Sequence, residues 1–145
     1  MIGFPDEFFD SILECIDAWE ELGIQAIPFF ATPYPGSEWY YTYKDEILKQ
    51  YNDDLEKFIL DLGDATKITA VISENFNAVE LLGLRELMLT HDKKRIKEYE
   101  KIWLSTHGEP YIPDFVHQAK PENAGKYDLN LKPTKKINLK ITKGV

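Results

Sequence analysis

The chain has 145 residues and a formal net charge of −8, with 43% hydrophobic and 13% aromatic residues. This composition excludes a disordered or fibrous protein, and the length allows one hydrophobic core but falls short of the roughly 250 residues of a complete eight-fold barrel. No run approaches the roughly 18 consecutive apolar residues of a membrane span, and the N-terminus lacks a secretory leader pattern, so we expect a cytoplasmic protein without membrane contact.

The charge is unevenly distributed along the chain. Residues 1–65 contain 15 acidic and three basic residues, a net charge of −12, whereas residues 66–145 carry +4. Nothing in the acidic half suggests nucleic-acid binding, and the lysines of the second half are too diluted with acidic residues to form a phosphate-binding stripe. Solvated helix faces account for this pattern, and a surface for a protein partner is the alternative.

The first elements are predicted to be strand, helix and strand. Met1–Phe4 has the character of a strand end, and Asp6 is a suitable N-cap for the helix that follows. Gly23 is predicted to end that helix. Ile24–Ala31 is an apolar run of strand length, and Pro28 within it favours an edge strand because proline donates no ladder hydrogen bond.

The next segments are predicted to be mainly helical. Residues 44–62 show helical periodicity that ends at Gly63. Ile68–Ile72 is short, apolar and strand-like. Asn77, followed three residues later by Glu80, forms a capping-box pattern and predicts another helix start.

The second half of the chain ends in a helix and an irregular tail. Asp92 is predicted to start a helix that ends at Gly108. Its inward positions are Ile96, Tyr99 and Trp103. Beyond it, several prolines break regular structure, and two alternating stretches within residues 127–141 indicate a hairpin or a loosely attached tail.

Two short motifs carry the functional information. Gly3–Glu7 reads Gly-Phe-Pro-Asp-Glu, and Thr32–Tyr40 reads Thr-Pro-Tyr-Pro-Gly-Ser-Glu-Trp-Tyr. In this order and spacing they resemble two turns of radical S-adenosylmethionine (SAM) enzymes, particularly the branch with a cobalamin-binding domain. The chain departs from that family at Asp6, where glycine is usual, and at Phe8 and Ser37, where threonine is usual.

The resemblance implies a fold and an arrangement of domains. It implies an α/β fold, the C-terminal part of a partial (β/α)6 radical SAM barrel, followed by a helical extension and an irregular or hairpin tail. The implied divisions are residues 1–43 for the last βαβ unit, 44–108 for the helical extension and 109–145 for the proline-containing tail. Both motifs would then follow parallel strands and lie side by side at one rim of the sheet, where α/β barrels hold their ligands.

The resemblance also implies cofactors and partners. Radical SAM enzymes bind SAM and a [4Fe–4S] cluster, and cobalamin is a further candidate in this branch. The family's Cys-x3-Cys-x2-Cys cluster motif would lie upstream of Met1, and this chain has one cysteine, Cys15. We therefore expect the C-terminal portion of such an enzyme, inactive without a missing N-terminal barrel portion from the same gene or a split partner, and acting on a small molecule.

The resemblance assigns binding roles to the two motifs and no catalytic residue. The residues expected to contact SAM are Gly3, Phe4, Pro5, Glu7, Phe30 and Ala31. The residues expected to line a substrate pocket are Thr32, Tyr34, Trp39 and Tyr40.

Other chemistry finds little support in the sequence. Cys15 is expected to be a buried or half-buried thiol, and His91, His107 and His117 lack the spacing of metal ligands. No nucleophile elbow, phosphate-binding loop or dinucleotide fingerprint is present. The alternative to the radical SAM hypothesis is a non-enzymatic acidic α/β module that binds a protein partner through residues 1–65.

Overall fold

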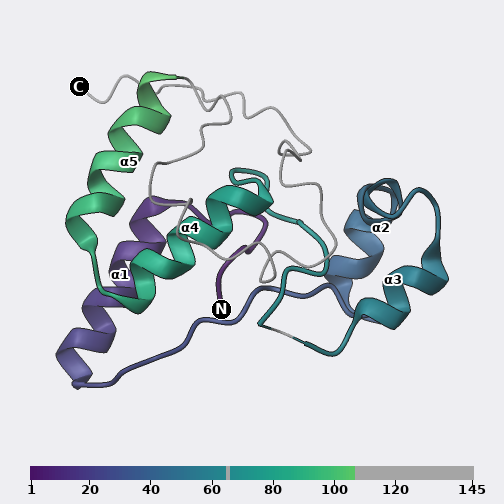
Figure 1. Cartoon of the computed structure of the whole chain (residues 1–145), viewed down its shortest axis with the longest axis horizontal. Helices are drawn as coiled ribbons and strands as arrows, with labels where there is room; N and C mark the ends of the chain where they lie inside the picture. Colours follow the sequence, from purple (N-terminus) through teal and green to yellow (C-terminus); the bar gives the residue numbers. More distant parts are fainter. Residues whose placement is uncertain (65, 107–145) are drawn as a thin grey trace.

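Five helices joined by extended segments make up the described part of the chain (Figure 1). The computed structural model describes residues 1–64 and 66–106. The helices are α1 (Phe9–Leu22), α2 (Glu38–Gln50), α3 (Leu55–Asp61), α4 (Ala78–Leu89) and α5 (Lys93–Ser105). In Figure 1, α1, α4 and α5 form one group, and α2 and α3 lie together on the other side of the molecule.

The predicted α/β barrel portion is wrong. Within residues 1–64 and 66–106 there is no β-sheet, and the β pairing is one parallel bridge between Ile2 and Phe30. The segments predicted as strands lie outside the helices: Met1–Phe4 precedes α1, Ile24–Ala31 follows α1, and Ile68–Ile72 lies between α3 and α4. The chain is therefore helical in its described part, and no piece of a (β/α)6 barrel is present there.

Side chains take the hydrogen bonds that neighbouring strands would make. The amide of Gln50 donates to the Val71 carbonyl and accepts from the Val71 N–H, both at 2.9 Å. Arg85 Nε donates to the Pro28 carbonyl at 2.9 Å, and proline has no N–H to offer to a further strand. Buried backbone groups need a partner, and these side chains supply it without a sheet.

Two predicted helix boundaries are also corrected. The helix expected over residues 44–62 begins earlier and is broken into α2 and α3. The break lies at Asn52 and Asp53, whose positive φ angles of 53° and 62° cannot continue a right-handed helix. The expected N-cap Asp6 lies outside α1, whose N-cap is Phe8, held by the Ser11 hydroxyl.

Other local predictions are confirmed. Gly23 ends α1 in the left-handed conformation, with φ of 64°. Asn77 and Glu80 form the predicted capping box at the start of α4. The predicted inward residues of α5 are buried: Ile96, Tyr99 and Trp103. The helix ends at Ser105, and its expected stop at Gly108 and the predicted hairpin over residues 127–141 lie outside the described residues.

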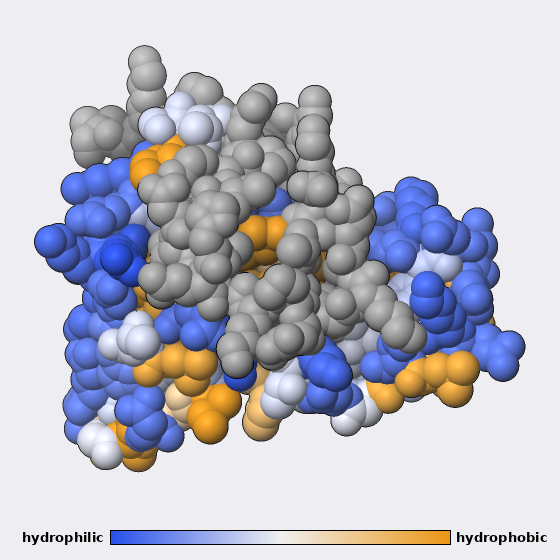
Figure 2. Space-filling model, in the orientation of Figure 1, coloured by the Kyte–Doolittle hydropathy of each residue, from blue (hydrophilic) through white to orange (hydrophobic). Residues whose placement is uncertain are grey.

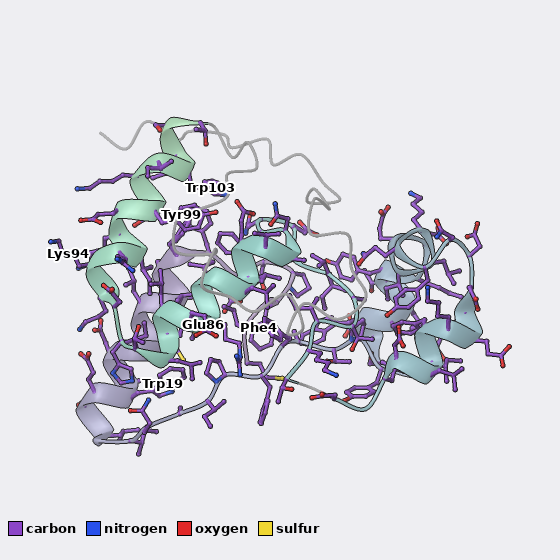
Figure 3. The ribbon with its side chains drawn as sticks, in the orientation of Figure 1. Phe4, Trp19, Glu86, Lys94, Tyr99 and Trp103 are labelled. Carbon is purple, nitrogen blue, oxygen red and sulfur yellow. The ribbon has the colours of Figure 1, made fainter. Side chains whose placement is uncertain are left out.

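Two hydrophobic cores hold the helices. The first core joins α1, α4 and α5, and Figure 3 shows Tyr99 and Trp103 of α5 directed toward the other two helices. The second core joins α2 and α3 through residues including Tyr40, Ile47 and Phe58. The extended segments run between the cores, so the turns that carry the two motifs lie at their junction.

Candidate functional site

The bridge between the first residues and the segment after α1 brings the two motifs together. Ile2 N–H donates to the Phe29 carbonyl and Ala31 N–H donates to the Ile2 carbonyl, each at 2.8 Å. Because the pairing is parallel, Gly3 and Ala31 leave the bridge in the same direction. The turn at residues 3–7 and the turn at residues 32–37 therefore start side by side.

Phe4 and Trp39 join the two turns through their rings. Phe4 lies within the turn at residues 3–7, and Trp39 is the second residue of α2. Their ring centroids are 5.4 Å apart, with an interplanar angle of 72°. Both side chains are half-buried, so one part of the pair packs inward and another faces solvent. Figure 3 shows Phe4 near the middle of the molecule, between the two groups of helices.

The first turn is held by a buried carboxyl group. Glu7, only 8% exposed, accepts a hydrogen bond from the Gly3 N–H. Burial raises the pKa of Glu7 above its ordinary value, against the opposing effect of the Gly3 and Phe4 amides. Gly3 has φ of +94°, and a Cβ atom there would lie 3.3 Å from Leu81 Cδ1. The turn thus requires glycine at this position and uses Glu7 to stabilise its backbone.

The second turn is built by its own hydroxyl groups. Thr32 Oγ1 donates to the Phe30 carbonyl at 3.2 Å, and Ser37 Oγ donates to the Tyr34 carbonyl at 2.7 Å. Ser37 also caps α2 by accepting from the Tyr40 N–H at 3.2 Å. Ser37 therefore supplies a capping hydroxyl, and the cap orients the start of α2, where Trp39 lies.

A third segment, residues 73–75, completes the site and was missed from the sequence. Asn75 Nδ2 donates to the Glu7 carbonyl at 2.6 Å, and Glu74 N–H donates to the Pro5 carbonyl at 2.8 Å. The signal that could have indicated it is Ser73, whose hydroxyl accepts from the amides of residues 75 and 76 in a tight turn just before α4.

Glu74 also connects this segment to α2. The Tyr43 hydroxyl donates to Glu74 Oε1 at 2.9 Å. Burial and this hydrogen bond to a carboxylate, together with the nearby charge of Asp6, raise the pKa of Tyr43 to about 12. The carboxyl groups of Asp6 and Glu74 thus both lie near the Tyr43 hydroxyl, and the carboxyl group of Glu7 is buried against Gly3.

Several predicted site residues do not offer their side chains to this surface. Phe30 is 3% exposed and packs in the first core under the guanidinium of Arg85, whose Cζ lies 5.6 Å from the ring centroid. Ala31 and Tyr40 are buried in the second core, where Tyr40 stacks on Phe58. Tyr34 is exposed at the tip of the second turn. The predicted site residues whose side chains contact each other are Phe4 and Trp39, whereas Glu7 and Thr32 are buried and bond to backbone groups.

The described residues do not fit an iron–sulfur cluster. Such a cluster needs several thiolates close together, and Cys15 is alone, half-buried in α1 against the first core. Burial raises the pKa of its thiol, which disfavours the thiolate. Across residues 1–64 and 66–106, no three histidine, cysteine or acidic side chains are grouped as metal ligands.

Planar rings beside carboxylates define what this surface can bind. A half-exposed aromatic pair stacks on flat heteroaromatic rings, and carboxylates accept hydrogen bonds from hydroxyl and ammonium groups. The surface suits a small molecule with a planar ring, hydroxyl groups and a positive charge.

The comparisons with known proteins give no family. No protein-family model, no curated protein and no solved structure matches the chain. Each helix in the part of the chain that the structure describes is too short or too polar to cross a lipid bilayer. The function must therefore be inferred from the chain's own residues.

Proposed function

We propose that the surface around Phe4 and Trp39 binds the nucleoside part of SAM and belongs to a radical SAM enzyme whose cluster ligands lie on another portion or polypeptide. The observation that supports this most directly is the ring contact between Phe4 and Trp39, which joins the two motifs that resemble that family. The proposal concerns the site alone and requires no barrel in this chain.

The adenine, the ribose and the sulfonium centre of SAM each have a suitable group on this surface. The half-buried rings of Phe4 and Trp39 would stack on adenine, and Glu74 and Asp6 would accept hydrogen bonds from the ribose hydroxyls. The positive sulfonium centre is attracted by the same carboxylates. SAM, when bound, supplies an activated carbon–sulfur bond, and this chain's residues contribute binding, orientation and exclusion of water.

The predicted roles of the buried residues change accordingly. Phe30 and Ala31 can reach a ligand only through their backbone, because their side chains lie in the two cores. Glu7 acts on the turn, since its carboxyl group is directed to Gly3. Cobalamin, the reacting small molecule and the cytoplasmic location belong to this proposal as expectations from the resemblance and the single cysteine.

The test is a titration of the full chain with SAM followed by backbone amide NMR. We expect the amide signals of residues 3–7 and 37–41 to shift. S-adenosylhomocysteine, which lacks the positive charge on sulfur, should bind more weakly. Trp39→Leu should weaken SAM binding about tenfold through loss of the stacking surface. Tyr41→Leu is the matched control, because Tyr41 is exposed on the same helix.

Two results would contradict the proposal. One is a SAM titration in which shifts are absent or cluster away from both turns in the folded chain. The other is equal SAM affinity for Trp39→Leu and the unchanged chain.

The alternative is a non-enzymatic module that binds a protein partner, and it is favoured by the −12 charge of residues 1–65. The two functions differ in their genetic context. A neighbouring or upstream reading frame with a Cys-x3-Cys-x2-Cys motif, and co-purification of its product with this chain, supports the enzyme. A monodisperse chain without such a neighbour supports the interaction module.

A further inference from the structure

Five large apolar side chains are exposed at Met1, at the end of α1 and along the segment that follows α1. The apolar stripe consists of Leu22, Ile24, Ile27, Phe29 and Met1, whose exposed fractions are 70%, 47%, 61%, 46% and 59%. Figure 2 shows hydrophobic residues along the lower rim of the molecule, where the segment after α1 runs in Figure 1. Single exposed apolar residues are ordinary, but a contiguous set marks an interaction surface.

The backbone explains why this face is exposed. Side chains alternate across an extended segment, so Ile27 and Phe29 lie on the face opposite to Pro28 and Phe30. Pro28 and Phe30 are buried, and the parallel bridge places Met1 beside Phe29. One face of the two bridged segments therefore packs into the first core, while Ile27, Phe29 and Met1 face outward.

Several backbone groups along the edges of the two bridged segments are already bonded. The carbonyl of Pro28 is taken by Arg85 and that of Phe30 by Thr32, and proline has no N–H. On the other edge, Gly3 N–H is taken by Glu7. Docking through the side chains of the stripe, which is how an amphipathic helix binds, needs none of these bonded groups.

The negative charge beside the stripe indicates that a partner would be positively charged. The exposed face of α1 that leads to Leu22 carries an acidic row: Asp10, Glu14, Asp17 and Glu21. Lys93 pairs with Asp17 and Glu20, at 2.8 and 2.6 Å, and Asp10, Glu14 and Glu21 form no ion pair with any described residue.

The helix dipole adds to this negative field. The C-terminal end of a helix carries a partial negative charge that basic residues normally offset. The last turn of α1 contains no basic residue of its own. Glu20 in that turn is paired with Lys93, whereas Glu21 forms no ion pair with a described residue. A positively charged partner would offset the charge of Glu21 and of the helix end.

We propose that the apolar stripe is the docking site for a basic amphipathic helix of a partner protein. Apolar residues of that helix, repeating every three to four positions, cover Ile24, Ile27 and Phe29, while its lysine or arginine residues lie along the acidic row of α1. The inference stands independently of SAM binding, because it uses no residue of the aromatic pair or the carboxylates beside it.

The experiment uses synthetic fluorescent peptides as probes of the full chain. The test peptide is a helix of ~18 residues, about five turns, with leucine on one face and lysine on the other. One control peptide has glutamate in place of lysine, and a second has serine in place of leucine. We expect saturable anisotropy changes with the lysine–leucine peptide, weakening as salt is raised, and at least about tenfold weaker binding of both controls.

Variants of the chain locate the binding surface. Ile27→Ser with Phe29→Ser should lower the affinity about tenfold or more, through loss of apolar contact. Glu14→Gln with Glu21→Gln should also weaken binding and reduce its dependence on salt. Ile59→Ser is the matched control, because Ile59 is 48% exposed on α3, away from the stripe. Circular dichroism of each variant checks that its helices are intact.

Three outcomes would overturn the proposal. The first is equal binding of the glutamate and lysine peptides. The second is unchanged affinity in the folded Ile27→Ser, Phe29→Ser variant. The third is sedimentation showing that the chain dimerises and that the same variant abolishes dimerisation, which would assign the stripe to a second copy of this chain.

Discussion

Glu7 illustrates how a side chain within a candidate binding motif can stabilise the backbone instead of contacting a ligand. Its carboxyl group is buried and bonded to the Gly3 N–H, and the main-chain carbonyl of Glu7 accepts from Asn75. A glutamate in such a motif is easily taken as a ligand contact. Here it stabilises the turn on which Phe4 is carried.

The pKa of Glu7 gives a pH-dependent prediction. Because the pKa is raised in the folded protein, its contribution to stability is fully present below the unfolded value of about 4.5 and is lost as pH rises through the folded pKa. Glu7→Gln keeps an acceptor for Gly3 and cannot ionise. We expect this variant to remove that part of the fall in stability, measured by urea unfolding at a series of pH values.

Glu7→Ala separates the hydrogen bond from the charge. It leaves the buried Gly3 N–H without its acceptor and should cost about 1–3 kcal/mol of unfolding free energy at neutral pH. Asp10→Ala, at an exposed acidic position of α1, is the control and should change stability by less than about 0.5 kcal/mol.

For the Glu7→Gln variant, the contradicting outcome is a dependence of stability on pH identical to that of the unchanged chain. It would show that the pKa of Glu7 is not raised in the folded protein.

At the scale of elements, the connection between α3 and α4 depends on α2. Segment 68–73 is buried throughout yet lies in no sheet. The Gln50 amide binds both backbone groups of Val71, and the Tyr51 hydroxyl donates to the Thr69 carbonyl at 2.8 Å. Two side chains at the end of α2 therefore replace a neighbouring strand.

Replacing Gln50 should expose this dependence. Gln50→Ala leaves the N–H and carbonyl of Val71 unpaired, and we expect a loss of at least about 1–3 kcal/mol in chemical denaturation. Lys49→Ala removes a 70% exposed side chain from the adjacent position and should change stability by less than about 0.5 kcal/mol. Equal stability of the two variants would mean that water satisfies Val71 as well as Gln50 does.

For the whole molecule, the two cores are joined by shared extended segments. Phe30 lies in the first core and its neighbour Ala31 in the second, and within segment 68–72 Val71 belongs to the first core and Ile72 to the second. Alternation of side chains across an extended backbone makes this sharing possible. Neither core can be lost without releasing residues that hold the other.

We therefore expect both cores to unfold in one transition. Phe58→Ala in the second core should cost about 3–5 kcal/mol and Leu84→Ala in the first about 2–5 kcal/mol. Each variant should shift the unfolding of both cores together, followed through the fluorescence of chains that retain only Trp39 or only Trp103. Separate midpoints for the two tryptophans would show independent cores.

The helices near residues 9–22, 78–89 and 93–105 were predictable because their signals are local. Gly23, the Asn77 and Glu80 capping box, and the spacing of Ile96, Tyr99 and Trp103 act within a few residues. The break at Asn52 and Asp53 was missed, because periodicity over residues 44–62 continues across it. The predicted fold class was wrong because the apolar extended runs were taken as strands.

The sequence by itself determined the end of α1, the starts of α4 and α5 and the inward residues of α5, because caps and periodicity depend on neighbours in the chain. Only the tertiary structure decided that the extended runs form no sheet and that residues 73–75 join the two motifs at the candidate site. The partners of an extended backbone come from distant positions, and here Gln50, Arg85 and Glu7 supply them in place of strands.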